Sequence, residues 1–276
     1  MKAVIKIGGT LLESAADRLR LAKLIGQHWQ AGHQILLVHG GGKQLTQYLE
    51  KSGIASQFVE GLRVTTEESL DGVVKVFAGT INHQLLAAFH QAGVPAAGIS
   101  GIDGSCLLAS KRVGQPGQDW GYVGQIQKVN PLLWETLLAA RFVPVLASLA
   151  VGENGQVYNV NADQVAVTCA IHLQADCLVF LTDVDGVQDA QGRTLTRVAA
   201  EEIPVLLHSG AVSGGMLAKL NTVQEALAQG VERVVIANGH RNDVLNDVFR
   251  LFAGRADGQL PVGTVVTSSP LTVKRS

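Results

Sequence analysis

The sequence has few of the features that mark specialised protein classes. Its three cysteines, Cys106, Cys169 and Cys177, are odd in number and far apart, which fits neither a disulfide framework nor a zinc site, so we interpret them as small core residues in a reducing cytoplasm. No apolar run approaches the roughly 18 residues of a membrane span, and the first nine residues lack the apolar stretch of a secretory signal. A net charge of −1 and a pI of about 6.7 argue against a nucleic-acid partner.

The chain does contain the regular alternation of a large α/β protein. Its 276 residues suit one domain, or two lobes that share a sheet, better than two independent domains. Apolar runs at Ala3–Ile7 and Gln34–His39 are typical of buried parallel strands. Between them, apolar residues keep helical spacing over residues 21–29, and Gly32 follows where a helix commonly ends. These segments predict one βαβ unit.

A longer helix is predicted to begin near Thr65, which has the spacing of a capping box with Glu68. Apolar residues continue at helical spacing as far as Phe89. Because about 26 residues is long for a globular helix, we expect Gly72 or Gly79 to bend or break it.

Further apolar runs at Val143–Ser148, Cys177–Thr182 and Arg233–Ala237 predict more buried strands. Alternation within Gly101–Asn130 predicts a small antiparallel hairpin layer. The whole chain is therefore predicted to form an open, mostly parallel sheet with helices on both faces. Ligands of such folds bind beyond the carboxyl ends of the strands.

Glycine is the residue in excess, with 31 copies, and it clusters where the first two strands end. Gly8-Gly9 follows the first strand and Gly40-Gly41-Gly42 follows the second. Consecutive glycines let backbone N–H groups approach an anion, whereas an ordinary strand-to-helix turn needs only one. The spacing matches neither a P-loop nor a dinucleotide-binding fingerprint, so the standard NTPase and dehydrogenase sites are not predicted.

Two lysines interrupt apolar surroundings. Lys6 lies within the first strand, and Lys219 follows Ser213-Gly214-Gly215 at the edge of a helical apolar stripe. A buried ammonium group needs an anion beside it. The ordinary alternatives are a lysine that extends to solvent at a strand end and a surface lysine on the helix.

A polar segment alternates through Asn159, Asn161 and Asp163, which would all face one side of an extended strand. Asp163 is also placed to cap the helix that begins near Gln164, and the two roles are compatible. The paired asparagines favour a polar cleft.

Three other features suggest ligand contacts. The loop Thr182–Val187 follows an apolar strand as a nucleotide-binding loop would, although Asp185-Gly186 also suits an ordinary turn. Arg63 offers a two-pronged donor for a carboxylate, with a peripheral salt bridge as the alternative. His39 is as consistent with a hydrogen-bonded core histidine as with a catalyst, and the chain shows no nucleophile-elbow motif.

Taken together, six motifs in order along residues 3 to about 265 resemble the amino acid kinase family. They are Lys6-Ile7-Gly8-Gly9, His39-Gly40-Gly41-Gly42, Gly61-Leu62-Arg63-Val64-Thr65, Asn159-Val160-Asn161-Ala162-Asp163, Thr182-Asp183-Val184-Asp185-Gly186 and Gly214-Gly215-Met216-Leu217-Ala218-Lys219.

This resemblance implies a three-layer αβα sandwich and transfer of the γ-phosphoryl of MgATP to a carboxylate. The nearest branch of the family phosphorylates the γ-carboxylate of N-acetyl-L-glutamate in arginine biosynthesis. The resemblance also implies that an N-terminal lobe, residues 1–173, binds the acyl amino acid and mediates dimerisation. Residues 174–276 would form a C-terminal lobe that binds ATP, with Mg²⁺ held mainly by the ATP phosphates.

The resemblance assigns roles residue by residue. Lys6 and Lys219 would stabilise the transferred phosphoryl group, with Asp163 orienting both lysines. The acyl amino acid and ATP would be held by two further sets of residues: Gly41, Gly42, Arg63 and Asn159 for the former, and Gly8, Gly9, Thr182, Asp183, Val184, Asp185, Gly186, Val187, Ala211, Val212 and Ser213 for the latter.

Several alternatives stay open at this stage. A kinase of a related acid such as acetylaminoadipate differs in substrate by one methylene, which is worth only about 1–3 kcal/mol in a pocket. A catalytically silent sensor of nucleotide or amino acid with the same fold is a second alternative, and a Rossmann oxidoreductase a third. The chain begins at its first strand without the extra N-terminal helix of hexameric, arginine-inhibited members, so we expect a cytoplasmic homodimer insensitive to arginine. The helix over Thr66–Ala92 is the candidate interface.

Overall fold

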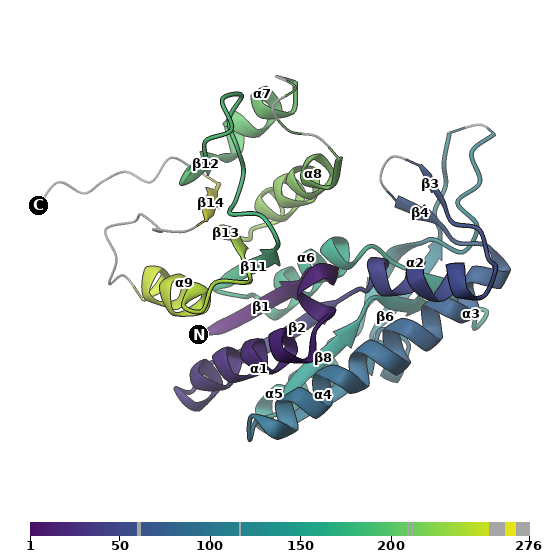
Figure 1. The fold of residues 1–276 in the computed structure, drawn as a ribbon, viewed down its shortest axis with the longest axis horizontal. Helices are drawn as coiled ribbons and strands as arrows, with labels where there is room; N and C mark the ends of the chain where they lie inside the picture. The colour runs from purple at the N-terminus through teal and green to yellow at the C-terminus, as the bar shows by residue number, and fades with distance from the viewer. Residues whose placement is uncertain are drawn as a thin grey trace, which may run out of the picture.

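The computed structural model describes residues 1–59, 62–115, 117–208, 210, 212, 214–253 and 263–268. Within them, an eight-stranded sheet has the order β12-β14-β13-β11-β1-β2-β8-β5 (Figure 1). Six neighbouring strands from β13 to β5 are parallel. Strand β14 runs antiparallel to β13, and β12 runs parallel to β14. The strands are β1 (Lys2–Ile7), β2 (Gln34–His39), β5 (Ala96–Ser100), β8 (Val143–Ala147), β11 (Cys177–Thr182), β12 (Arg197–Ala199), β13 (Arg233–Asn238) and β14 (Thr264–Thr267).

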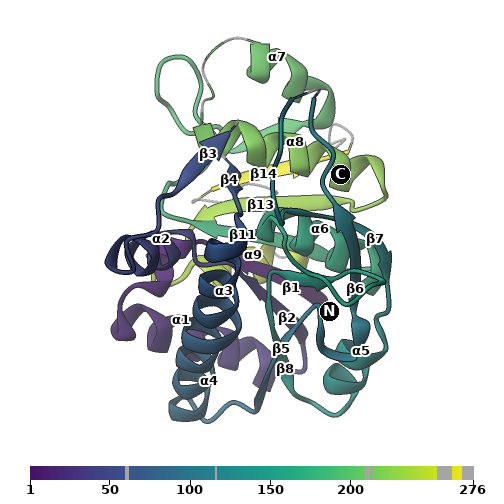
Figure 2. The same ribbon diagram turned by 90° about the vertical axis from the view of Figure 1, so that its right-hand side faces the viewer.

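Helices cover both faces of this sheet (Figures 1 and 2). One face carries α1 (Ala15–Gln30), α4 (Asn82–Gln91) and α9 (Val244–Phe252). The other carries α5 (Leu132–Ala139), α6 (Ala162–Leu173) and α8 (Gly214–Ala228). The predicted three-layer αβα sandwich with a mostly parallel sheet is confirmed.

Smaller elements surround the carboxyl ends of the strands. A four-stranded sheet, ordered β10-β9-β6-β7, contains the predicted antiparallel hairpin as β6 and β7, and a separate hairpin joins β3 to β4. The bounds are β3 (Gln57–Val59), β4 (Leu62–Val64), β6 (Leu107–Lys111), β7 (Gly124–Val129), β9 (Leu149–Val151), β10 (Val157–Asn159), α2 (Gly42–Lys51), α3 (Glu67–Val74) and α7 (Ile203–His208), with short 3₁₀ turns at Gly9–Leu12, Asp103–Ser105 and Ala200–Glu202.

The predicted long helix forms, but its expected cap is wrong. Its N-cap is Thr66, whose hydroxyl accepts a hydrogen bond from the Ser69 N–H, whereas the Thr65 hydroxyl bonds to another element. Neither glycine breaks the helix. The chain passes from α3 into α4 through a π-helical segment, Lys75–Ile81, which widens the turn without interrupting it.

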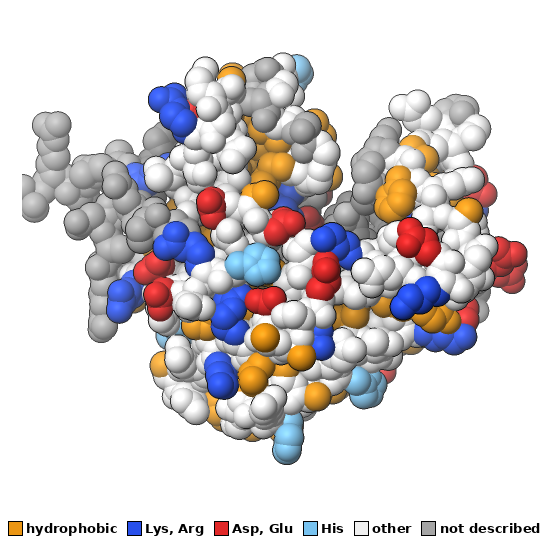
Figure 3. Space-filling view, viewed as in Figure 1, with side chains coloured by type: hydrophobic (Ala, Val, Ile, Leu, Met, Phe, Trp, Pro, Cys, Tyr) orange, Lys and Arg blue, Asp and Glu red, His pale blue; other side chains and the backbone are white. Residues whose placement is uncertain are grey.

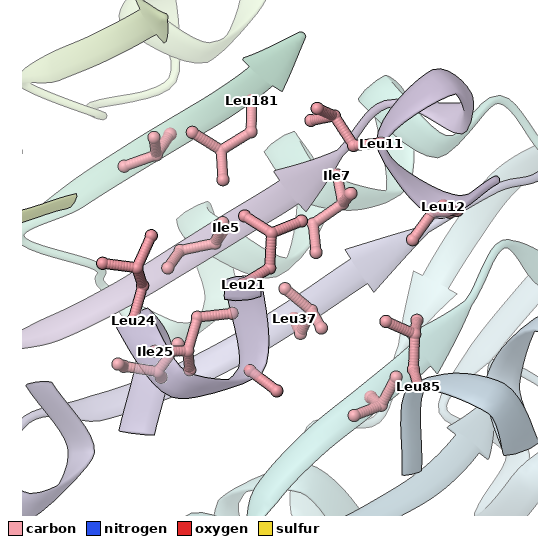
Figure 4. Packing of buried hydrophobic residues seen from close by; sticks show 14 of the residues in the cluster. Ile5, Ile7, Leu11, Leu12, Leu21, Leu24, Ile25, Leu37, Leu85 and Leu181 are labelled. Atoms are coloured by element: carbon pink, nitrogen blue, oxygen red, sulfur yellow. The ribbon is translucent and has the colours of Figure 1, made fainter. Parts of the chain in front are cut away.

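Strand alternation decides which side chains face which helical layer. On β1, Ala3, Ile5 and Ile7 pack with α1 residues such as Leu21 and Ile25 (Figure 4). The intervening positions face the opposite layer, so Val4 lies in the second cluster and the side chain of Lys6 is directed toward α6 and α8. The fold thus directs a cation toward the interior layer that contains Asp163 and Lys219.

The three cysteines are free and buried, as predicted for core residues. Among the described residues, no helix combines the length and the apolar character required to cross a membrane.

Candidate active site

A cleft of about 420 Å³ lies beyond the carboxyl ends of β1 and β2. Figure 3 shows a hollow between two arms of the molecule, one bearing α7 and α8 and the other bearing the β3–β4 hairpin. Seven of the predicted site residues line the cleft: Lys6, Gly9, Gly41, Gly42, Arg63, Asn159 and Asp163. Its volume is in the usual range for a small-molecule site.

The two lysines converge on one carboxylate. Lys6 Nζ lies 2.9 Å from Asp163 Oδ1, and Lys219 Nζ donates a hydrogen bond of 2.6 Å to Asp163 Oδ2. The side chains of Lys6, Asp163 and Lys219 are only 15%, 14% and 9% exposed. The ammonium group of Lys219 also lies 4.7 Å from the centre of the Phe180 ring, a cation–π contact. The alternatives of solvent-exposed lysines are therefore wrong for this chain.

The cluster sets two lysine side chains against one carboxylate. Burial alone would raise the pKa of Asp163, but the two ammonium groups outweigh that effect and hold its pKa well below the usual range. Burial lowers the pKa of Lys219, an effect that Asp163 opposes and the neighbouring Lys6 reinforces. One carboxylate cannot neutralise two ammonium groups, so an additional anion would be attracted to this point.

Arg63 is 9% exposed, and its hydrogen-bond partners come from outside its own strand, β4. Its guanidinium donates to Ser56 Oγ, to Thr46 Oγ1 at 2.5 Å and to the Gly42 carbonyl at 3.2 Å. Its outer face stacks over the ring of Phe58 at 4.5 Å. Burial lowers the pKa of Arg63, with Glu50 opposing the shift, yet a guanidinium stays charged in proteins. The Arg63 guanidinium is therefore a fixed positive charge in the cleft wall, where it could bind a carboxylate.

One glycine of the loops packs tightly against the core. A Cβ on Gly41 would lie 2.0 Å from Ile81 Cδ1, so a larger residue there would force the Ile81 side chain to move. Gly41 is the N-cap of α2, which directs the free N–H groups of its first turn toward the cleft. On the other loop, the Gly8 N–H is bonded to the Leu181 carbonyl at 2.8 Å, which leaves Gly9 as the glycine of this pair that lines the cleft.

The polar segment near Asp163 reaches the cleft by a different backbone from the one predicted. Strand β10 ends at Asn159, and Asn161 is the N-cap of α6, accepting from the N–H groups of Asp163 and Gln164. Asp163 therefore does not cap this helix, because its oxygens are taken by the lysines. Asn159 donates one side-chain N–H to Thr65 Oγ1 at 2.9 Å, so its side-chain oxygen and its second N–H are left for a ligand. All three residues still line one cleft.

The predicted nucleotide loop is far more exposed. Asp183, Val184 and Asp185 are exposed, and Asn238 donates to Asp185 at 3.0 Å. Gly186 is buried, and Val187 is wholly buried with its N–H on Thr264 Oγ1, so Val187 supports the loop from beneath. The Thr182 hydroxyl donates to Asp183. Val212 lies in the core, while Ala211, Ser213 and also Gly61 fall outside the described residues.

Among the described residues, no three acidic, histidine or cysteine side chains lie close enough together to bind a metal ion. The buried carboxylate, Asp163, has an ammonium group on each of its oxygens. The described residues therefore do not fit a protein-held Mg²⁺ ion.

Some residues that hold the site's charged side chains escaped the sequence analysis. Thr46 and Ser56 hold Arg63, and Phe180 lies beneath Lys219. Thr46 lies four residues after Gly42, a helical spacing that places both on one face of α2, and this is the one signal that would have found it. Ser56 and Phe180 carry no such signal, because they meet the site only through the tertiary fold.

A crevice rich in fixed positive charge and free backbone amides suits ligands that are themselves anions, as in proteins that move phosphoryl or carboxyl groups. The chain belongs to the amino acid kinase family, whose model matches residues 1–238.

Named relatives agree. Acetylglutamate kinase of Solibacter usitatus is 47% identical over 258 residues, covering 94% of this chain and 98% of the relative, and acetylglutamate kinase of Acidobacterium capsulatum is 43% identical over 90% and 95%. Among solved structures, N-acetylglutamate synthase from Neisseria gonorrhoeae, complexed with coenzyme A and N-acetyl-glutamate, superimposes with a TM-score of 0.83 at 28% identity, covering 98% of this chain and 60% of that one.

Proposed function

We propose that this protein transfers the γ-phosphoryl group of MgATP to the γ-carboxylate of N-acetyl-L-glutamate, forming N-acetyl-L-glutamyl 5-phosphate in arginine biosynthesis. The observation that carries the proposal is the pair of lysines on one buried carboxylate at the edge of the cleft. The acetylglutamate kinases among the relatives, up to 47% identical over nearly the whole chain, support the choice of substrate.

The reaction is an encounter between anions. One oxygen of the γ-carboxylate forms a bond to the γ-phosphorus, the bond from that phosphorus to the bridging oxygen breaks, and ADP leaves with its electron pair. A carboxylate is already ionised at neutral pH, so no general base is required. Catalysis then rests on positioning the reactants and neutralising their charge.

The charge cluster suits that task. Lys6 reaches Asp163 from β1, in the proposed N-terminal lobe of residues 1–173. Lys219 reaches it from α8, in the proposed C-terminal lobe of residues 174–276. Asp163 holds the side-chain nitrogens of both lysines in place, one on each of its oxygens. Their position is therefore set before the ligands arrive, as electrostatic stabilisation of a transition state requires.

The acyl amino acid would occupy the cleft. Arg63 is placed to bind its α-carboxylate, Asn159 completes the pocket with its amide oxygen, and the amides of Gly41 and Gly42 bind the reacting end. ATP would extend from Gly8 and Gly9 across Thr182–Val187 to Ala211–Ser213. Mg²⁺ would be held mainly by the ATP phosphates.

Trapping the product tests this function directly. Purified protein is incubated with MgATP and hydroxylamine, which converts an acyl phosphate to a hydroxamate, in parallel arms with N-acetyl-L-glutamate, acetylaminoadipate, aspartate or no acid. We expect hydroxamate with N-acetyl-L-glutamate. A larger yield with acetylaminoadipate would make the protein a kinase of that acid, and no hydroxamate in any arm would favour a silent sensor.

We further propose a cytoplasmic homodimer. The three buried free cysteines suit a reducing compartment. The candidate interface, the helix from α3 to α4, has an exposed polar face that includes Asp71, Lys75 and His83, so hydrogen bonds and ion pairs would join the subunits there. Light scattering tests the assembly, and a hexamer would contradict the proposed dimer. An activity assay with micromolar arginine tests the proposed insensitivity to arginine, which inhibition would contradict.

A further inference from the structure

A buried histidine lies directly beneath the glycine loop of the cleft. His39 is the last residue of β2 and is wholly buried. Its ring is held at both nitrogens: Nδ1 lies 2.9 Å from the Gly40 carbonyl oxygen, and Nε2 lies 3.1 Å from Asn82 Nδ2. A carbonyl only accepts and an amide NH₂ only donates, so these partners assign the hydrogen to Nδ1. Burial lowers the pKa of His39 to about 4, which keeps the ring neutral.

The bond to Gly40 constrains more than one atom. The carbonyl of Gly40 and the N–H of Gly41 belong to the same planar trans peptide and point in opposite directions. Fixing the carbonyl against His39 therefore fixes the Gly41 N–H on the opposite side, and Gly40, Gly41 and Gly42 all line the cleft. Within the described residues, no protein acceptor takes the Gly41 N–H.

Asn82 is itself held with little freedom. Its Nδ2 also donates to the Val145 carbonyl at 2.9 Å, and it is 3% exposed. A Cβ added to Gly98 on β5 would lie 1.9 Å from Asn82 Oδ1, so a glycine at this position leaves space for the Asn82 amide. The contacts run without a gap from the core of the sheet to the loop of the cleft.

We propose that His39, oriented by Asn82, is a positioning residue that sets the Gly40–Gly41 peptide plane and so presents the Gly41 N–H to the anionic ligand in the cleft. This inference rests on the proposed phosphoryl transfer, in which that N–H would stabilise charge on the reacting carboxylate or phosphoryl oxygens. A histidine serving the core alone would not need its ring hydrogen on the loop that lines the site.

Substitutions that keep or remove the bond to Gly40 test the role. His39→Leu removes it, and we expect kcat to fall about 10²-fold, the scale of misplacing a catalytic group by about 1 Å. His39→Asn places an amide nitrogen near the position of Nδ1, and we expect it to recover kcat to within about fivefold of wild type. The matched control is His28→Leu, because His28 is a half-buried histidine that does not line the cleft, stacked on Phe249 at 4.0 Å, and its loss should leave kcat unchanged.

A double-mutant cycle tests whether Asn82 acts through His39. Asn82→Leu should lower kcat by about tenfold, and the double variant His39→Leu/Asn82→Leu should fall no further than His39→Leu alone, since residues in one network are not additive. Full additivity of the two losses would overturn the proposed order of action.

Nitrogen-15 NMR of the histidine rings and of the Gly41 amide gives a readout independent of turnover. We expect the Nδ1–H form of His39 in wild type and a displaced Gly41 amide signal in His39→Leu, restored in His39→Asn. An Nε2–H ring, an unmoved Gly41 signal, or a folded His39→Leu variant with kcat within threefold of wild type would each overturn the proposal. If His39→Leu does not fold, His39→Asn and the NMR spectrum decide. Absence of hydroxamate with the wild-type protein would instead refute the proposed function, and the NMR result would still stand.

Discussion

The two ends of the candidate site are built in opposite ways. On the side proposed to bind the acyl amino acid, Arg63 is buried against Thr46, Ser56 and Phe58, and Asp163 carries a lysine on each oxygen. On the side proposed to bind the nucleotide, Asp183 and Asp185 are exposed. Buried charges with fixed partners have little freedom to reorganise, whereas exposed carboxylates are screened by water.

This difference is consistent with the roles proposed for the two sides. Neutralising charge at the reacting atoms needs groups that are already in place, so burial would suit the lysines and the arginine in those roles. Holding a nucleotide can be shared among many weak contacts, so single exposed residues matter less. Substitutions on the two sides should therefore differ in size and in the kinetic constant they change.

The largest loss is expected at the charge cluster. Lys6→Ala or Lys219→Ala should each lower kcat at least 10²-fold, because each removes a preorganised charge beside the transferred group. Steady-state kinetics with saturating substrates measure this, with the exposed Lys23→Ala on α1 as the control. Near-normal turnover in either variant would remove that lysine from the mechanism.

The next largest effect is expected on the free energy of unfolding in mild acid. The pKa of His39 is about 4 in the folded protein and about 6.5 in the unfolded chain, so the unfolded state binds more protons between these values. Above pH 6.5 the His39 ring is neutral in both states and takes nothing from the free energy of unfolding. As the pH falls below 6.5, protonation of the unfolded chain lowers that free energy. Between pH 6.5 and about 5, we expect His39 to account for a fall of about 2 kcal/mol in the free energy of unfolding.

Urea denaturation of wild type and His39→Asn across this pH range isolates the histidine. The difference between the two unfolding free energies should narrow as the pH falls. Parallel curves would mean that His39 becomes protonated without cost in the folded protein.

A smaller and more selective effect is expected at Arg63. Arg63→Ala should raise KM for N-acetyl-L-glutamate about tenfold, the scale of losing a charged hydrogen bond, and should change KM for ATP far less. Varying each substrate in turn separates the two constants. Equal increases in both would contradict a clamp on the acyl amino acid.

The smallest effect is expected on the exposed side. Asp185→Ala should raise KM for ATP about threefold and leave KM for the acyl amino acid unchanged, because an exposed carboxylate that accepts a hydrogen bond from the nucleotide contributes about 1 kcal/mol or less. Glu232→Ala, just before β13 at the opposite end of the sheet, serves as the control. A 10²-fold change at Asp185 would show that the two sides are not built as differently as they look.

Much of this molecule was predictable from local patterns. Apolar runs and helical spacing gave β1, α1, β2 and the long helix, because period and burial are properties of short segments. The errors arose where two local signals competed. Thr65 and Thr66 are both plausible caps, and only the bond from Asn159 shows why Thr65 is used elsewhere. Likewise, Asp163 resembles a cap until the lysines are seen to occupy it, and Asn161 then takes that position.

Local patterns were enough to predict the strands, the glycine turns and the two lysines in apolar surroundings, since each depends on neighbours a few residues apart. The folded layers were needed to show that Lys6 and Lys219, 213 positions apart, meet on Asp163, and that the His39 ring contacts Gly40 and Asn82. Such meetings follow from strand order and from which face of the sheet a side chain occupies, and these are properties of the assembled layers rather than of any segment.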